Sequence, residues 1–148
     1  MGLILLFAGL IFAASPEETQ VTAAVQHLFD AMAAHDAAAI GTAFVKDARM
    51  VAVRPDGTVS VTTAEDFSTR IGAAKEAYLE RMWEPKVLIR GAIAQLWAPY
   101  DFHREGKFNH CGIDSVSLVK VEGVWKIAGI SYTSETSNCP TSPLGPVQ

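Results

Sequence analysis

The residues best suited to chemistry lie in one stretch of the chain, Leu96 to Thr133, which predicts two consecutive β-hairpins. The natural reversal points are Glu105-Gly106 and Glu122-Gly123. A two-residue turn fixes the register of its strands, and the register decides which side chains share a face. The polar residues that this register gathers at one end of a sheet face are Asp101, His110, Asp114 and Ser131.

Specific cross-strand neighbours follow from the two turns. In the first hairpin Asp101 is expected opposite His110, and Trp97 opposite Asp114. In the second hairpin Asp114 is expected opposite Ser131. A sheet face that is apolar at one end and ionisable at the other is typical of a pocket wall. The apolar end of this face carries Ile93, Leu118, Trp125 and Ile127.

A carboxylate in such a place is suited to proton transfer. Asp114, partly desolvated beside Trp97, would have a raised pKa and could exchange a proton with a substrate. His110 next to Asp101 would form an oriented acid–base pair. We therefore name Asp114, His110 and Asp101 as candidate catalytic residues. The candidate ligand contacts are Trp97, Asp114 and Ser131.

Purely structural roles explain the same residues and remain open. Asp101 and His110 could form a cross-strand ion pair at a sheet edge, worth roughly 0.2 to 1 kcal/mol. Asp114 could accept hydrogen bonds from Ser131 or from the Trp97 indole and so satisfy a half-buried polar layer. The residue types alone leave the choice between structure and chemistry undecided.

The dipeptide His110-Cys111 suggests a metal site or a thiol nucleophile at first sight. Adjacent residues of a strand point to opposite faces, so the two side chains cannot converge on one ion or one substrate. The sequence also lacks a phosphate-binding glycine loop, a G-x-S-x-G elbow and a dinucleotide fingerprint. We expect neither a metal nor a cofactor.

The N-terminus and the cysteines indicate export. The first fourteen residues are uncharged and almost wholly apolar, a run too short to span a membrane and typical of a secretory signal, which we place at residues 1–15. No Lys or Arg precedes this run, so an uncleaved anchor or a misplaced start codon remains open. Exported domains often pair two cysteines, which predicts a Cys111–Cys139 disulfide in a periplasmic or extracellular protein, free of the membrane after signal removal. Two free thiols are the alternative.

Length and composition indicate one folded domain. The chain has 148 residues, of which 49% are hydrophobic and 19% are charged, and this balance favours a globular core over disorder. The net charge is −4 and no basic run occurs, which argues against a nucleic-acid partner.

Helices and a small hairpin come first, followed by long strands. Capping residues at Ser15, Asp36 and Thr63 predict three helices. Between the second and the third, residues 48–62 predict a small hairpin. Residues 78–83 are expected to retain helical structure, which Pro85 ends. The remaining segments are strands at 86–104, 108–121 and 124–134, and a flexible tail at 136–148.

This order of elements predicts an α+β fold, with a curved antiparallel sheet packed against the N-terminal helices. The outer face of that sheet is neither charged nor strongly apolar. Such a face suits covering by another sheet, so we expect a homodimer through it, with a solvated sheet as the alternative. The residues assigned to this face are Ser115, Ser117, Val119, Ala128, Ile130 and Tyr132.

The order of elements also resembles a known superfamily. The matching pieces are Asp36-Ala37-Ala38-Ala39-Ile40, the strand Ala48 to Val53, and Gly123-Val124-Trp125-Lys126-Ile127. Together they resemble the nuclear transport factor 2-like superfamily, which includes ketosteroid isomerases and SnoaL-like cyclases. The resemblance covers about residues 17–135, and we place the domain at 16–135. It implies a cystatin-like cone with an internal pocket.

We accordingly expect an exported protein that binds a small apolar or aromatic molecule in an apolar pocket with a polar mouth. Two alternatives stay open. The resemblance implies that an isomerase or cyclase would use a pocket aspartate to remove a proton next to a carbonyl, although no catalytic residue of those families aligns here. The chain could also be a structural dimerisation module whose cone is filled by its own side chains.

Overall fold

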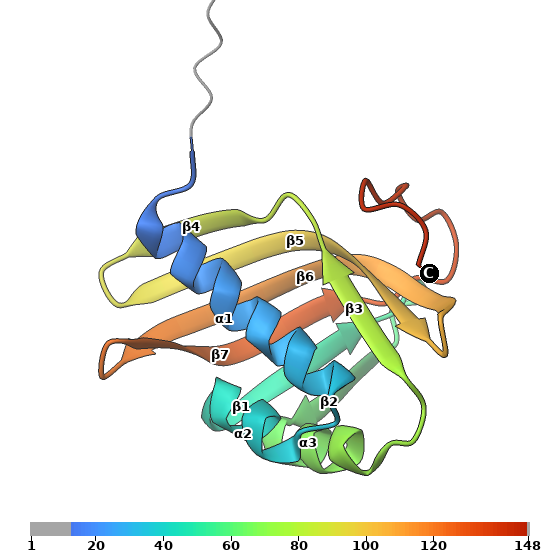
Figure 1. The fold of residues 1–148 in the computed structure, drawn as a ribbon, viewed down its shortest axis with the longest axis horizontal. Coiled ribbons are helices and arrows are strands. Elements are labelled where there is room, and N and C mark those ends of the chain that lie inside the picture. The colour runs from blue at the N-terminus through green and yellow to red at the C-terminus, as the bar shows by residue number, and fades with distance from the viewer. Residues whose placement is uncertain (1–12, 148) are drawn as a thin grey trace, which may run out of the picture.

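The computed structural model describes residues 13–147 (Figure 1). The predicted export signal at residues 1–15 therefore lies outside the described residues except for its last three. Within residues 13–147, no helix combines the length and the apolarity needed to cross a membrane. In chain order the elements are α1 (Pro16–Ala33), α2 (Ala37–Ala43), β1 (Phe44–Val53), β2 (Val59–Thr63), α3 (Ala64–Ala73), β3 (Tyr78–Met82), β4 (Lys86–Arg90), β5 (Ile93–Arg104), β6 (Lys107–Val121) and β7 (Val124–Thr133).

All three helices begin at the capping residues that the sequence predicts. Ser15 and Glu18 form a reciprocal capping box at the start of α1. The side chain of Asp36 accepts a hydrogen bond from the backbone of Ala39, and Thr63 caps α3 in the same way. These local hydrogen bonds fix where each helix starts and so determine which side chains face the sheet.

The strands form one curved sheet in the order β2-β1-β7-β6-β5-β3, with β4 also paired to β5. Helix α1 runs across one face of this sheet, and α2 and α3 lie at one end of it (Figure 1). The sheet is mixed, not antiparallel as expected, because β1 pairs in parallel with β7. This pairing joins the first and the last strand of the chain, and local patterns carry no signal for such a distant contact.

The partners of β5 correct two further predictions. The segment expected to be helical is strand β3, which pairs with the second half of β5, while β4 pairs with the first half. The long strand expected at 86–104 is divided by a turn at Gly91, whose φ is +58°. The distant partner β5 overrides the weak local preference of residues 78–82.

Both long hairpins have the predicted two-residue turns, but each contains a bulge beyond its turn. The turn residues have positive φ angles, as tight hairpins require. In the first hairpin Asn109 is an extra residue, because Phe102 pairs with His110 while His103 pairs with Phe108. Ala128 is the extra residue in the second hairpin.

Each bulge shifts the pairing by one residue, and one residue is enough to exchange the two faces of a strand. The prediction that Asp101 faces His110 is therefore wrong, since Asp101 pairs with Cys111. Trp97 pairs with Ser115, not with Asp114. The other corrected pairs are Ala98 with Asp114, Asp114 with Tyr132, and Ser115 with Ser131.

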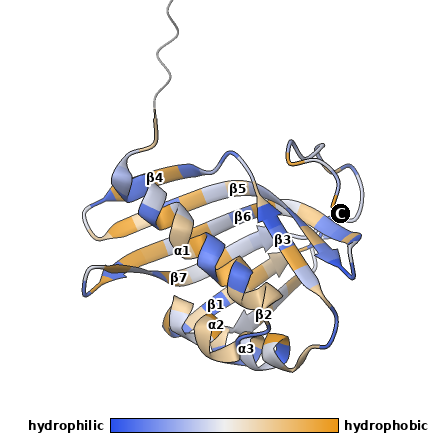
Figure 2. Ribbon diagram, in the orientation of Figure 1, coloured by the Kyte–Doolittle hydropathy of each residue, from blue (hydrophilic) through white to orange (hydrophobic). Residues whose placement is uncertain are grey.

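The core lies between the concave face of the sheet and the helices. Buried apolar residues of α1 pack with those of β5, β6 and β7. Figure 2 shows hydrophobic segments, in orange, along these strands. Ile130 and Tyr132, which were assigned to the outer face, belong to the concave side because of the bulge at Ala128. Ile93, expected at the apolar end of the pocket wall, is 60% exposed.

Candidate functional site

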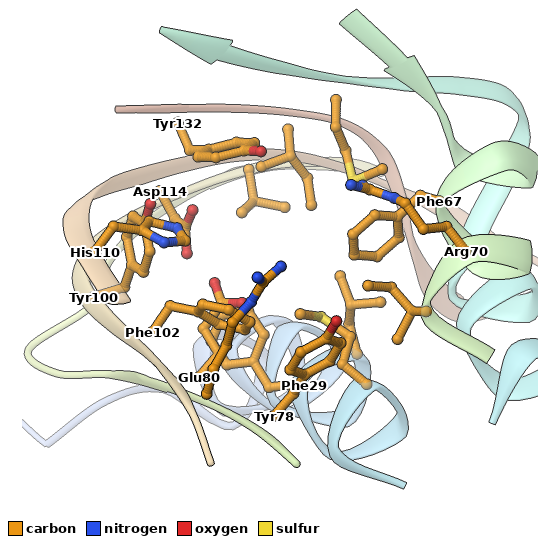
Figure 3. Close-up of a pocket in the computed structure, with 17 residues that line it drawn as sticks. Phe29, Phe67, Arg70, Tyr78, Glu80, Tyr100, Phe102, His110, Asp114 and Tyr132 are labelled. Carbon is orange, nitrogen blue, oxygen red and sulfur yellow. The ribbon is translucent and has the colours of Figure 1, made fainter. Parts of the chain in front are cut away.

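A cavity of about 180 Å³ lies between the sheet and helices α1 and α3. Aromatic and aliphatic side chains form most of its wall; Asp114 and His110 lie at one end of it, and Arg70 lies beside Phe67 at the other (Figure 3). The cone is therefore not completely filled by its own side chains. The residues that matter for its chemistry are Arg70, Glu80, Arg104, His110, Asp114 and Tyr132.

The polar end is built around two carboxyl groups, those of Glu80 and Asp114. Glu80 lies on β3 and Asp114 on β6, the two strands that flank β5, and both side chains turn toward the cavity (Figure 3). Asp114 is only 4% exposed. Each carboxyl group influences the pKa of the other, so the two lie close together in the wall of the cavity.

Burial raises the pKa of both carboxyl groups. Loss of water raises the pKa of Asp114 to about 7. Desolvation, followed by the nearby charge of Asp114, raises the pKa of Glu80 well above its ordinary value. Both shifts favour the protonated form of these carboxyl groups more than exposure to water would.

His110 stands beside this pair as a neutral base. Its ring contacts the rings of Tyr100 and Phe102, with centroids 5.6 and 5.0 Å away. Burial, together with the charge of Arg104, lowers the pKa of His110 to about 4. The ring atom Nδ1 lies 2.8 Å from Asn109 Oδ1, an acceptor, so the tautomer with a proton on Nδ1 leaves Nε2 as an acceptor.

Tyr100 connects the site to the framework of the sheet. Its hydroxyl donates a hydrogen bond of 2.7 Å to the carbonyl oxygen of Thr133, so its proton is not free for a ligand. Burial raises the pKa of this hydroxyl. Tyr132, which pairs with Asp114 across β6 and β7, also lines the cavity, and burial raises the pKa of its hydroxyl as well. Gly112 lies between these residues, where an added Cβ would approach Thr133 O to 2.2 Å.

Of the predicted site residues, only Asp114 and His110 line the cavity. Asp101 turns to the outer side, where Arg81 donates two hydrogen bonds of 2.8 and 2.6 Å to it and His103 Nε2 lies 3.2 Å away. Trp97 is 51% exposed on the outer face, and Ser131 is exposed there too. The bulges explain all three displacements, because every residue beyond a bulge changes face.

The sequence interpretation missed three charged residues of the cavity, Arg70, Glu80 and Arg104, of which Glu80 carries the second carboxyl group. Residues 78–82 were expected to be helical, so their side chains were not assigned to a sheet face. Tyr78 to Met82 do not alternate strictly between apolar and polar residues, so no local signal marked this segment as a strand or Glu80 as facing the cavity.

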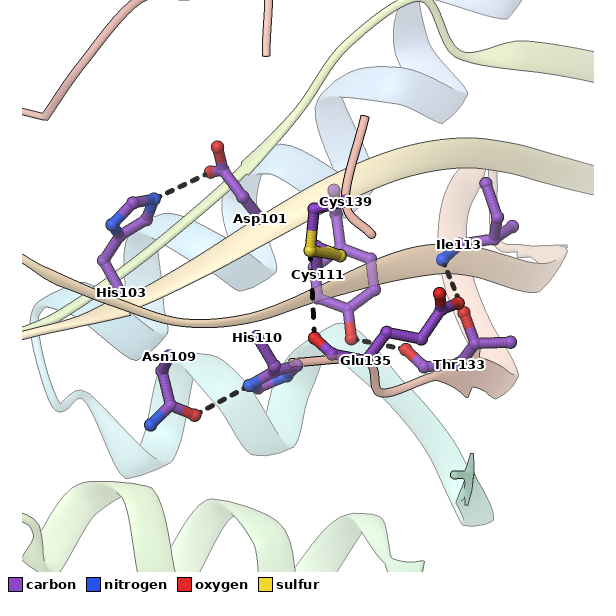
Figure 4. Close-up of a disulfide and its surroundings, with 10 residues drawn as sticks. Asp101, His103, Asn109, His110, Cys111, Ile113, Thr133, Glu135 and Cys139 are labelled. Carbon is purple, nitrogen blue, oxygen red and sulfur yellow. Dashed lines mark hydrogen bonds and ion pairs between the residues drawn. A yellow bond between two sulfur atoms is a disulfide. The ribbon is translucent and has the colours of Figure 1, made fainter. Parts of the chain in front are cut away.

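The predicted disulfide is confirmed. Cys111 and Cys139 are bonded, with their Cα atoms 6.0 Å apart, on the outer side of β6 (Figure 4). The backbone of Cys111 also exchanges two hydrogen bonds of 2.9 Å with Glu135. These contacts hold the start of the C-terminal segment against the outer side, and Arg81 reaches the same segment through Gly145 O.

Comparisons with known proteins support this description. A family model described as "Putative lumazine-binding" matches residues 16–133. No curated protein matches the chain. Among solved structures, an NTF2-like protein of unknown function from Shewanella baltica is similar over 82% of this chain and 95% of its own, with 18% identity and a TM-score of 0.62.

Two further solved structures have the same fold. A protein of unknown function from Mycobacterium tuberculosis covers 82% of this chain and 73% of its own, with 15% identity and a TM-score of 0.69. A protein of unknown function with a cystatin-like fold from Nostoc punctiforme covers 89% of this chain and 98% of its own, with 10% identity and a TM-score of 0.65. At these identities the likeness concerns the fold alone.

Proposed function

Because the chain belongs to the lumazine-binding-like family, within the nuclear transport factor 2-like superfamily, we propose that it binds a small planar molecule in the cavity between the sheet and helices α1 and α3. The observation that carries this proposal is the cavity itself, with a mostly apolar wall and one polar end. An apolar cavity with a few convergent polar groups is the usual form of a ligand site. The faces of the ligand would pack on the rings, and its edge would meet Glu80 and Asp114.

Filling the cavity tests this function. Val116 lines the cavity, while its neighbour Ser117 is exposed on the opposite face. We expect Val116→Phe to reduce binding of lumazine at least tenfold in a fluorescence titration, because the larger ring occupies the ligand's place. Ser117→Phe adds the same ring outside and should leave binding unchanged. Native mass spectrometry of protein purified from its own host provides a second readout, the mass of a bound molecule.

Absence of binding by the folded wild-type protein, in both measurements, would contradict the proposed function. Equal loss of binding in both variants would place the ligand elsewhere. Circular dichroism melting curves of the two variants show whether each remains folded during these measurements.

We also propose that the protein acts outside the cytoplasm. The paired cysteines support this location, because disulfides persist in oxidising compartments. The uncharged apolar segment at residues 1–15 supports it from the sequence side. Thiol titration of unfolded, unreduced protein taken from the host tests the pairing, and two reactive thiols would contradict it.

A second candidate is an enzyme of the isomerase or cyclase type, which the carboxyl pair favours. Asp114 with a pKa of about 7 suits a base that removes and returns a proton near neutral pH. With a bound carbonyl compound as the probe, Asp114→Asn would reduce proton exchange next to the carbonyl by 10² or more in an enzyme. Exchange that is absent from the wild-type complex would exclude this candidate and leave the binding function.

A further inference from the structure

The cavity has a buried end and an exposed end, and the two ends carry different ionisable groups. Asp114 is 4% exposed, whereas Arg70, at the other end, is an exposed residue (Figure 3). A charged group of a ligand loses less hydration at the exposed end than beside the buried carboxyl groups. The exposed end is therefore the place where the cavity can receive the charge of a ligand.

The guanidinium of Arg70 is held at the cavity wall without an acidic partner. Arg70 lies in the last turn of α3, three residues after Phe67, and its guanidinium carbon is 5.6 Å from the centroid of that ring. Within residues 13–147, Arg70 forms an ion pair with none of the carboxylates. Stacking uses the flat face of the guanidinium and leaves the N–H groups at its edge available for an anionic acceptor.

Tyr132 supplies a second donor to the same wall. Its side chain extends in Figure 3 from the end with Asp114 toward the end with Arg70. Burial raises the pKa of the Tyr132 hydroxyl, and the nearby charge of Arg70 only partly offsets this rise, so the hydroxyl keeps its proton. The hydroxyl of Tyr100 donates to Thr133 O, whereas that of Tyr132 donates to none of the described residues.

A second arginine adds positive charge around the cavity. Arg104 lines it, stacks over Tyr78 with 5.5 Å from guanidinium carbon to ring centroid, and lies 3.6 Å from Glu76. The side chains of Arg104 and Glu76 are 48% and 53% exposed, so water screens the attraction between them. Of the two arginines that line the cavity, Arg70 is thus the one whose charge no described carboxylate compensates.

We propose that the ligand of this cavity is a planar aromatic compound with a carboxylate, which the guanidinium of Arg70 and the hydroxyl of Tyr132 bind at the exposed end. This inference rests on the proposed function and specifies the chemistry of its ligand. Two N–H groups of a guanidinium match the two oxygens of a carboxylate in one plane, and such a charge-assisted pair is stronger than a neutral hydrogen bond. The aromatic part of the ligand would extend inward among the apolar side chains, with its opposite edge toward Asp114.

A matched pair of lumazine derivatives tests the charge requirement. Lumazine-6-carboxylate and lumazine-6-carboxamide have nearly the same shape, and their substituent lies at the far end of the ring system from the pyrimidine N–H groups. In fluorescence titrations of the full chain at pH 7, we expect the carboxylate to bind about tenfold more tightly than the carboxamide. This preference should decrease as salt is added, because counterions reach the exposed end of the cavity.

Substitutions of single arginines assign the preference to one residue. Arg70→Gln should abolish the preference for the carboxylate, because glutamine keeps a neutral donor but has no charge. Arg70→Lys keeps the charge without the planar pair of donors, so we expect a preference of intermediate size. Arg104→Gln should reduce the preference less than Arg70→Gln does, because Glu76 already pairs with Arg104.

Arg90→Gln is the matched control for these variants. Arg90 is an exposed arginine at the end of β4 and does not line the cavity, so the loss of its charge should keep the wild-type preference. Melting curves identify any variant that is unfolded, and Arg70→Lys remains informative if Arg70→Gln does not fold.

The outcomes distinguish this inference from the function on which it rests. Equal affinities for the two derivatives, or tighter binding of the carboxamide, would overturn the carboxylate class while leaving a small-molecule site. Binding of lumazine without binding of either derivative would overturn it as well. A preference that survives in folded Arg70→Gln, or that Arg90→Gln also removes, would overturn the role of Arg70. If the folded wild-type protein binds none of the three compounds, the proposed function fails together with this inference.

Discussion

At the scale of the residue, the titration of Asp114 should make the stability of the protein depend on pH. Its pKa rises from 3.8 to about 7 on folding, so the folded state binds the proton more tightly than the unfolded state. The stability that comes from this proton is fully present below about pH 4 and is lost as the pH rises through 7. The wild-type protein should therefore lose stability between these values, by on the order of 1 to 4 kcal/mol.

Asp114→Asn tests this pH dependence, because asparagine does not titrate. We expect the variant to gain stability relative to wild type as the pH rises from 5 to 8, in urea unfolding curves. His110 acts in the opposite sense: its pKa is lowered to about 4, so its contribution is lost as the pH falls from 6.5 toward 4. That contribution is common to both proteins and cancels in the difference. Glu84→Gln should follow the wild-type curve, and a difference that does not change with pH would contradict the prediction.

The candidate site was partly predictable at this scale. Asp114 and His110 were identified from strand alternation, which places them on one face because they are four residues apart on β6 and both lie beyond the bulge at Asn109. Glu80 could not be identified as long as residues 78–82 were interpreted as helical. Asp101 was assigned to the wrong face because one inserted residue, Asn109, exchanges the faces of the strand.

At the scale of the element, the close approach of β6 and β7 beside the cavity depends on Gly112. A Cβ atom at this position would lie 2.2 Å from the carbonyl oxygen of Thr133, which also accepts the hydrogen bond from Tyr100. Gly112→Ala should separate the strands and destabilise the protein by roughly 1 to 3 kcal/mol. Chemical unfolding measures this change.

Gly129→Ala is the matched control for that substitution. Gly129 also lies in the sheet, but an added Cβ would be 3.4 Å from Arg49 O, close to ordinary contact. We expect a clearly smaller loss of stability there. Equal effects of the two substitutions would show that a general preference against glycine replacement, and not the approach to Thr133, causes the loss.

At the scale of the whole molecule, the outer face of the sheet suits contact with a second copy. Three large apolar side chains from β4 and β5 are exposed on it, with exposed fractions of 73% for Leu88, 60% for Ile93 and 51% for Trp97. A stable interface buries about 800 Å² per partner around such apolar anchors. We therefore propose a homodimer through this face, with the two cavities turned away from the contact.

Trp97→Asp tests the assembly. A charge in the centre of an apolar interface should shift the protein from dimer to monomer in sedimentation equilibrium, with a dissociation constant at least 100-fold higher. Val124→Asp places the same charge on a side chain of similar exposure, 55%, at the β6–β7 turn, and should leave the assembly unchanged. A wild-type protein that is monomeric at the highest concentrations would contradict the proposal.

The sequence by itself determined the features that depend on neighbouring residues. Helix caps, two-residue turns and the alternation of long strands involve contacts within a few positions, and these predicted the three helices, the hairpins and an α+β fold. Only the tertiary structure determined the parallel pairing of β1 with β7, the strand character of β3, and the two bulges. Each of these is selected by contacts between residues far apart in the chain. The approach of Glu80 to Asp114 depends on that long-range arrangement, because two distant strands must flank β5 before their carboxyl groups can lie close together.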